Sequence, residues 1–204
     1  MSLLEVYADV ACPFTHVGLR RVAARRADLG RDDVVLRVHA WPLELVNGRP
    51  LDAAFIAEEV DVLRATVAPD LFVGFREDAF PASSLPALDL AYAAYRVGDG
   101  VGERVSLALR TALFEDGRDV ADPAVLAEIA AAHGVATDPE SDRAGVLAEY
   151  DGGKARGVRG SPEFFAGGEG WFCPVLDVRR VDGALQVTAD EATMVRFLDA
   201  CFAA

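Results

Sequence analysis

The segment from Asp9 to His16 contains residue types that could support thiol chemistry. Cys12 follows a short apolar run and is followed by a proline, which is favoured at the first position of a helix. A cysteine at such a junction faces unpaired backbone N–H groups and the positive end of the helix dipole, and both favour the thiolate. We therefore expect Cys12 to have a lowered pKa and to be a nucleophile at neutral pH. The alternative is a buried structural thiol, which is a common fate of free cysteines.

Two polar residues follow Cys12 within one helical turn. The hydroxyl of Thr15 could hydrogen-bond the Cys12 sulfur, or it could be satisfied locally in the first turn. His16 lies four residues after Cys12, where an imidazolium would favour the thiolate and a neutral ring could act as a base. A partly exposed histidine without a role is the alternative. The three histidines have no metal-ligand spacing, so we expect no metal site.

Three residues farther along the chain complete the candidates. Cys173 could approach the face of Cys12 and act as a second thiol, although a packed strand-end cysteine is the favoured interpretation. Cys201 lies on the apolar stripe of the last predicted helix and is expected in the core. Trp41 closes the second predicted strand and could form an apolar wall beside Cys12, with core packing as the alternative.

The elements that must position these residues follow from the periodicity of apolar residues. Residues 3–8 and 34–41 are predicted strands, and residues 13–29 between them are a predicted helix, which gives a βαβ unit. Start and stop signals for helices follow one another from about 51 to 156. Strands return at 164–165, 174–181 and 184–187, the last two joined by the hairpin signal Asp182-Gly183, and a helix ends the chain. We expect residues 1–48 and 157–204 to form one sheet with flanking helices, and residues 49–156 to form an inserted helical domain.

Composition and charge narrow the class of protein. The chain has 204 residues, of which 52% are hydrophobic and 26% charged, as in an ordinary globular protein. The net charge of −13 disfavours nucleic acid and anionic membrane as partners. No uncharged apolar run approaches the ~20 residues needed to span a bilayer. The N-terminus lacks signal-peptide features, and three cysteines are too few for a disulfide framework, so we expect a reducing, cytoplasmic setting.

Three motifs follow one another along the chain. They are Asp9-x-x-Cys12-Pro13-Phe14, the segment Ala112 to Gly117 followed by Val125-Leu126 and Gly134-Val135, and the segment Gly157 to Phe165 that contains Ser161-Pro162. Together they resemble the DsbA-like branch of the thioredoxin superfamily, which includes 2-hydroxychromene-2-carboxylate isomerases and kappa-class glutathione transferases. The resemblance implies an α/β, thioredoxin-like fold with a large all-α insertion.

The candidate residues have expected roles. From their types and positions, we expect Cys12, Pro13, Thr15 and His16 to be catalytic, and Phe14 and Trp41 to contact a substrate or thiol. The resemblance implies that Ser161 and Pro162 also contact the bound molecule, and that the Ser161–Pro162 peptide bond is cis and close to Cys12.

This chain departs from the redox members of the family at Thr15, where they carry a second cysteine. A second thiol attacks the mixed disulfide formed by the first, and threonine cannot do so. The leading hypothesis is therefore a single-cysteine thiol-disulfide oxidoreductase whose mixed disulfide at Cys12 is resolved by an external thiol. The alternatives are a glutathione-dependent isomerase or transferase and a redox-inactive binding module. We expect no tightly bound cofactor, with glutathione or another low-molecular-weight thiol as the candidate partner. A small disulfide or other small molecule is the expected substrate, and a homodimer is left open.

Overall fold

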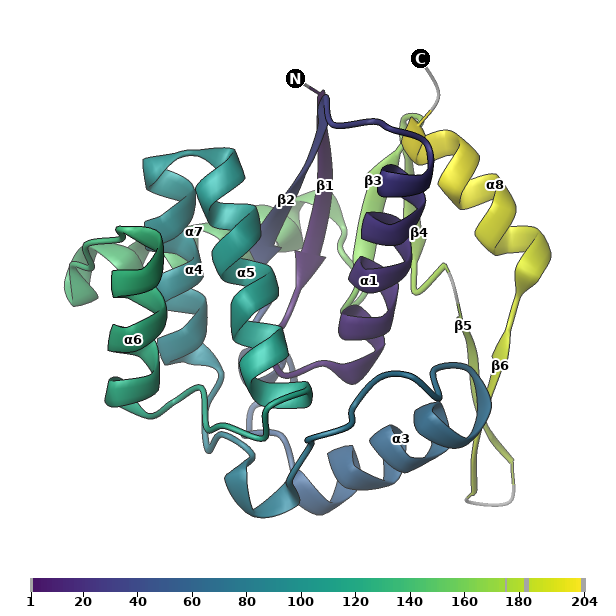
Figure 1. Cartoon of the computed structure of the whole chain (residues 1–204), viewed down its shortest axis with the longest axis horizontal. Coiled ribbons are helices and arrows are strands. Elements are labelled where there is room, and N and C mark those ends of the chain that lie inside the picture. The colour runs from purple at the N-terminus through teal and green to yellow at the C-terminus, as the bar shows by residue number, and fades with distance from the viewer. Residues whose placement is uncertain (1, 175, 182–183, 203–204) are drawn as a thin grey trace.

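Strands lie toward both ends of the chain, and helices fill its middle (Figure 1). The computed structural model describes residues 2–174, 176–181 and 184–202. The strands are β1 Ser2–Ala8, β2 Val34–Ala40, β3 Glu163–Ala166, β4 Glu169–Phe172, β5 Leu176–Val181 and β6 Ala184–Ala189. The helices are α1 Pro13–Asp28, α2 Leu43–Asn47, α3 Ala53–Thr66, α4 Leu85–Val97, α5 Asp99–Phe114, α6 Pro123–His133, α7 Pro139–Arg156 and α8 Glu191–Phe202, with a short 3₁₀ helix, η1, at Glu77–Ala79.

The main sheet joins strands from both ends of the chain. Its order is β2-β1-β3-β4, with β1 parallel to β2 and antiparallel to β3. Val6 in β1 is opposite Val38 on one side and Phe164 on the other. The βαβ unit predicted from the sequence is therefore present, and the strand after the helical segment returns to its edge.

The last two strands correct the expectation of a single sheet. Strands β5 and β6 pair only with each other among the described residues, and they form a separate two-stranded sheet that extends beside α3 (Figure 1). The place beside β3 is taken by β4, which the sequence analysis missed. Gly167 and Gly168 both have positive φ, and this left-handed backbone turns the chain back directly after β3. The predicted turn at Asp182-Gly183 lies outside the described residues.

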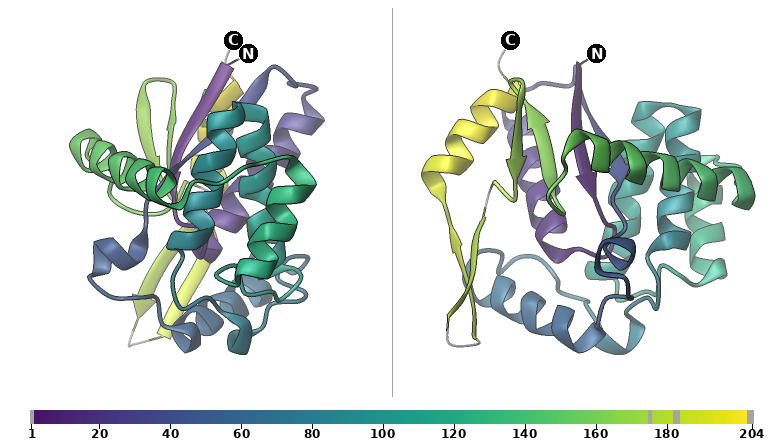
Figure 2. Two further views of the ribbon diagram at one scale, coloured as in Figure 1. Left: turned by 90° about the vertical axis from the view of Figure 1, so that its left-hand side faces the viewer. Right: turned by 180° about the vertical axis from the view of Figure 1, so that it is seen from behind.

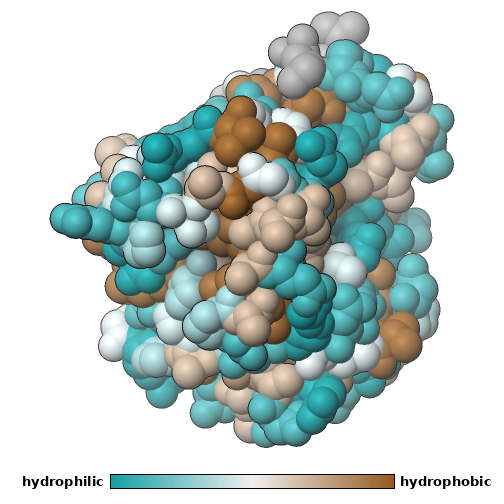
Figure 3. Space-filling model, turned by 60° about the vertical axis from the view of Figure 1, so that its left-hand side comes forward, coloured by the Kyte–Doolittle hydropathy of each residue, from teal (hydrophilic) through white to brown (hydrophobic). Residues whose placement is uncertain are grey.

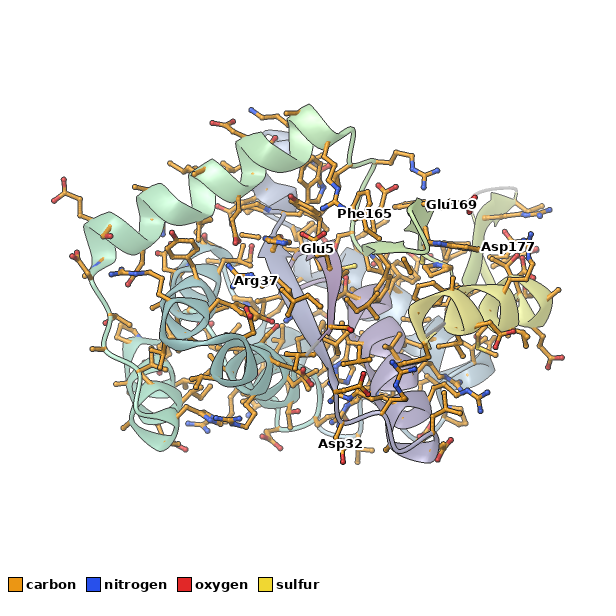
Figure 4. All side chains as sticks on the ribbon, turned by 90° about the horizontal axis from the view of Figure 1, so that it is seen from above. Glu5, Asp32, Arg37, Phe165, Glu169 and Asp177 are labelled. Carbon is orange, nitrogen blue, oxygen red and sulfur yellow. The ribbon has the colours of Figure 1, made fainter. Side chains whose placement is uncertain are left out.

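The two faces of the main sheet are covered by different helices. Figure 2 shows α7 on the side of the sheet away from α1. On the α1 side, Phe164 contacts Phe197 of α8 with ring centroids 4.9 Å apart, and Gly18 of α1 lies against the Phe164 ring. On the other side, Figure 4 shows Glu5 and Phe165 beneath the end of α7, where Arg156 binds Glu5 and lies over the Phe165 ring. Alternation along the strands thus produces an apolar face and a face with charged pairs.

Helix side chains cover the free edge of β2. The Tyr95 hydroxyl accepts a hydrogen bond from the Val38 N–H and donates to the Leu36 carbonyl. Glu103 and Glu149 accept hydrogen bonds from the backbone N–H groups of Leu36 and Ala40, each at 2.8 Å. An uncovered strand edge invites pairing with another chain, so these three side chains from α4, α5 and α7 tie the helical segment to the sheet.

The helices of the middle segment pack mainly on one another. A Cβ at Gly102 or Gly145 would clash with the ring of Tyr95 or Tyr92, so the absence of a side chain permits this close packing. Figure 3 shows the surface on this side of the molecule, where hydrophobic groups form small patches among hydrophilic ones. Within the described ranges, no helix has both the length and the apolarity to cross a membrane.

Candidate active site

Cys12 lies where β1 passes into α1. It is the N-cap of α1, with an extended backbone (φ −85°, ψ 115°), and Pro13 begins the helix. The side chain is buried, and Sγ donates a hydrogen bond to the Ser161 carbonyl at 3.2 Å. The Ser161–Pro162 peptide bond is cis and follows this carbonyl, as the motif resemblance predicted. The structure thus brings residues 12 and 161 together across 149 positions of sequence.

The protonation state of Cys12 differs from the expectation. Burial raises the pKa of the thiol above its ordinary value, the nearby charge of Glu59 raises it further, and hydrogen bonds with Thr15 and Ser161 lower it in part. The predicted lowering of the pKa is therefore wrong for this structure, because the helix N-terminus lies in a desolvated environment. Cys12 rests as a protonated thiol that is bound to a carbonyl oxygen.

The hydroxyl groups of Thr15 and Ser161 lie near the Cys12 sulfur. Thr15 is fully buried, and its Oγ1 lies 2.8 Å from Oγ of Ser161. The same Ser161 oxygen accepts a hydrogen bond from the Asp9 backbone N–H at 2.9 Å. Either hydroxyl can donate in this pair, and when Ser161 donates to Thr15, the threonine hydroxyl proton is available toward the Cys12 sulfur.

The loop before Cys12 is held by the buried carboxylate of Asp9. This carboxylate accepts hydrogen bonds from the Ala11 N–H, the Leu43 N–H and the Ser84 hydroxyl at 2.8, 2.6 and 2.9 Å. Burial raises the pKa of Asp9, and these three donors lower it in part. These contacts cap and anchor the loop.

A buried cation lies beneath the same loop. Arg110 of α5 donates to the Asp9 carbonyl at 3.0 Å and to the carbonyl and hydroxyl of Ser106 at 2.9 and 2.7 Å. Burial lowers its pKa to about 10, so the guanidinium still carries its charge at neutral pH. Sequence reasoning missed Arg110 because no local pattern distinguishes it from the surface arginines of other helices.

The His16 side chain contacts Glu115 and two aromatic rings, and among the described residues no hydrogen bond joins it to the Cys12 sulfur. Its Nε2 lies 2.5 Å from Oε1 of Glu115, and its ring packs against Phe72 and Phe114. Only 2% of the residue is exposed, so the alternative of a partly exposed histidine is wrong as well. Burial lowers the pKa of His16, and the hydrogen bond to Glu115 raises it in part. The contacts favour a structural role and give no support to His16 as the base for Cys12.

Cys12 lies at a cleft with a volume of about 420 Å³. Apolar side chains from α1, α2, α3 and the strands after Ser161 form most of its walls, and the lining residues are Cys12, Pro13, Phe14, Leu43, Val46, Asn47, Leu51, Phe55, Ile56, Glu59, Arg159, Gly160, Ser161, Phe172, Cys173 and Val178. Of these, Arg159 is the cation and Glu59 the acid. The cleft therefore suits a largely apolar molecule with a polar end.

The cleft contains some of the residues expected at a binding site and omits others. Phe14 and Ser161 line it as expected. Trp41 instead packs against Tyr7 and Tyr150, and the described lining residues do not include it, so the predicted wall beside Cys12 is formed by Leu43. The described part of the chain has no group of three His, Cys, Asp or Glu side chains arranged for a metal ion.

Comparison with known proteins places this geometry in a family. The model of the DSBA-like thioredoxin domain matches residues 3–186, so the chain belongs to the DsbA-like thioredoxin family and has a thioredoxin fold with a helical insertion. The comparison with curated proteins gives no match.

Solved structures with the same fold include enzymes of two kinds. A cytosolic disulfide reductase DsbM from Pseudomonas aeruginosa is 20% identical, with a TM-score of 0.59 over 96% of this chain and 91% of that one, and another structure is that of DsbM with GSH. A probable DsbA oxidoreductase from Streptomyces coelicolor is 23% identical, with a TM-score of 0.63 over 81% and 80% of the two chains. A 2-hydroxychromene-2-carboxylate isomerase is 16% identical, with a TM-score of 0.57 over 83% and 88%. At these identities the likeness concerns the fold.

Proposed function

We propose that the protein is a thiol-disulfide oxidoreductase that uses Cys12 as its attacking thiol. The observation that carries this proposal is the position of Cys12 Sγ, which contacts the Ser161 carbonyl at an apolar cleft. A disulfide bound in the cleft would offer one sulfur to Cys12. Arg159 at the cleft wall is paired with Glu163 through Nε and Nη2, and its exposed guanidinium would meet a carboxylate of the bound molecule in addition to that pair.

The reaction consists of two exchanges. The Cys12 thiolate attacks one sulfur of the bound disulfide, the S–S bond breaks, and the second sulfur leaves as a thiolate that takes up a proton. An external low-molecular-weight thiol then attacks the mixed disulfide and returns Cys12 to its reduced form. Because burial raises the pKa of Cys12, loss of its proton limits the first exchange, and the hydroxyl of Thr15 supports the thiolate when it forms.

Glutathione is the external thiol that we propose. Support comes from the structure of the related-fold DsbM with GSH and from Arg159 as the cation of the cleft. A reducing cytosol would supply this thiol and would keep three unpaired cysteines reduced.

The test is mass spectrometry of the protein after incubation with oxidised glutathione, followed by peptide mapping. We expect one glutathione on Cys12, no adduct on Cys12→Ser, and an unchanged adduct on Cys201→Ser. A protein that takes up no glutathione at Cys12, or that labels all three cysteines at equal rates, would contradict the proposal.

A glutathione-dependent isomerase or transferase is the second candidate, because the pKa of Cys12 is raised. A protonated Cys12 thiol could donate a hydrogen bond to the sulfur of bound glutathione and stabilise its thiolate. Under this hypothesis calorimetry would detect non-covalent binding of reduced glutathione that survives Cys12→Ser in weakened form, and no adduct would form. Absence of both binding and adduct would favour a binding module without thiol chemistry.

A further inference from the structure

A second cysteine shares the cleft of Cys12. Cys173 lies in the loop after β4 and lines the same cleft. Its backbone N–H donates to the Pro162 carbonyl at 2.9 Å, while the Cys12 thiol donates to the carbonyl of Ser161, the preceding residue. Two successive carbonyl groups of one loop therefore hold the two cysteines.

The backbone of Cys173 is unusual for a side chain of its type. Its φ is +43°, and among the described residues other than glycine only Phe72 also has a positive φ. Such a conformation persists only where the surrounding structure imposes it, and it is enriched at functional sites. Here it interrupts the extended run of β4 at the residue that lines the cleft.

An electrostatic interaction also links the two thiols. A negative charge on Cys12 disfavours a charge on Cys173 and so raises its pKa. Cys201 shows no such interaction with Cys12: burial is the cause of its raised pKa, and it lies on α8 away from the described cleft lining. The pair Cys12 and Cys173 is thus distinguished from the third thiol by its shared cleft.

We propose that Cys173 is an internal resolving thiol, which competes with direct attack by the external thiol and converts the mixed disulfide at Cys12 into a disulfide between Cys12 and Cys173. This step rests on the thiol-disulfide exchange proposed above. The thiolate of Cys173 attacks Sγ of Cys12, the bond between Cys12 and the bound thiol breaks, and that thiol leaves as a thiolate and takes up a proton. Two equivalents of an external thiol then reduce the Cys12–Cys173 disulfide and become oxidised to one disulfide.

The surroundings of Cys173 determine how fast it can attack the mixed disulfide. Burial, with the charges of Cys12 and Glu59, raises the pKa of Cys173 to about 12. The charge of Cys12 is absent once its sulfur is in the mixed disulfide, so one of these causes disappears at the step in which Cys173 must react. We therefore expect a slow resolution whose rate rises about tenfold per pH unit while Cys173 remains mostly protonated.

The experiment uses the whole protein carrying one glutathione at Cys12, freed of excess reagent. In wild type at pH 8, the adduct should disappear without added thiol, and non-reducing peptide mapping should find the Cys12 and Cys173 peptides joined by a disulfide. In Cys173→Ser the adduct should persist, with clearance at least tenfold slower, while Cys201→Ser should behave as wild type. Cys173→Ala and thermal unfolding of each variant separate loss of the thiol from loss of the fold.

The outcomes separate this proposal from the one on which it rests. An adduct that forms at Cys12 and persists equally in wild type and Cys173→Ser overturns the resolving role and leaves the exchange at Cys12 intact. Joined peptides that contain Cys201, or that link two protein molecules, overturn it as well. If no adduct forms at Cys12, both proposals fail together.

Discussion

The first turn of α1 separates two buried titratable side chains into opposite surroundings. Cys12 contacts the Ser161 loop and opens to an apolar cleft, whereas His16 contacts Glu115 and is enclosed by Phe72 and Phe114. Residues four apart on a helix usually share a face. The rule does not apply here, because Cys12 is the N-cap, whose backbone is extended.

This difference indicates that the Cys12 side of the helix serves reactivity and the His16 side serves stability. On the sulfur side, the carbonyl that accepts from Cys12 comes from the segment after the helical block, and the cleft admits another molecule. On the imidazole side, Glu115 also accepts hydrogen bonds from the backbone N–H groups of Phe72 and Val73, so the histidine joins α1 to a closed network. We infer that changes on the sulfur side alter reactivity and that changes on the imidazole side alter stability.

The largest effect on the sulfur side is expected from Thr15→Cys. Thr15 and Cys12 both bind Ser161, and Thr15 lowers the pKa of Cys12, so a thiol at position 15 is placed to attack the mixed disulfide. In a Cys173→Ser background, clearance of the glutathione adduct should rise at least about tenfold, by analogy with two-cysteine sites. Mass spectrometry over time measures this rate, and Thr15→Ser is the control. A variant that forms no disulfide between Cys12 and the introduced thiol under oxidising conditions would show that residues 12 and 15 are not arranged for exchange.

A smaller effect on the imidazole side is expected in the pH dependence of stability. The unfolded chain takes up a proton at His16 near pH 6.5, whereas burial lowers the pKa in the folded chain. The unfolded state therefore binds more protons below about pH 6.5. As the pH is lowered from there toward the pKa of folded His16, the free energy of unfolding decreases by up to about 1.4 kcal/mol per pH unit. His16→Gln should remove this part of the slope.

Urea unfolding between pH 5 and 8 measures that slope, a range above the ordinary titration of glutamate. Cys12→Ser is the matched control and should keep the wild-type slope, because the pKa of the Cys12 thiol is raised and not lowered. Equal slopes in His16→Gln and wild type would mean that the imidazole side does not carry the linkage assigned to it.

The sequence predicts the elements of this comparison better than their orientation. The apolar run before Cys12 and the proline after it place β1 and α1 close to their observed bounds, and the helices predicted between about 51 and 156 are present as α3 to α7. The motif at Ser161-Pro162 correctly brings the loop to Cys12. The division into residues 1–48 plus 157–204 and an insertion of 49–156 stays a prediction.

Other features depend on contacts that no local pattern reveals. Cys12 is desolvated by residues that come together only in the folded chain. Its position at a helix N-terminus, which the sequence shows, therefore does not reveal that its pKa is raised. Strand β4 is short and contains Gly170, which weakens its strand signal. Glu59 and Arg110 approach the Cys12 loop from helices far along the chain, and only the fold identifies them.

The smallest effect is expected from Glu59→Gln. Glu59 is buried at the cleft, and its negative charge raises the pKa of both Cys12 and Cys173. Without this charge, the Cys12 thiolate should be more abundant at pH 7, and alkylation of Cys12 by iodoacetamide should accelerate about three- to tenfold, which corresponds to a pKa lowered by up to about one unit. Glu58→Gln, an exposed neighbour on α3, should leave the rate unchanged. Because His16 lies on the other side of α1, the acid slope of stability should be the same in Glu59→Gln as in wild type. A Cys12 that reacts no faster in Glu59→Gln would show that the Glu59 charge does not control this thiol. An acid slope that changes together with the reactivity would show that the two sides of the helix are coupled and that the division drawn between them does not hold.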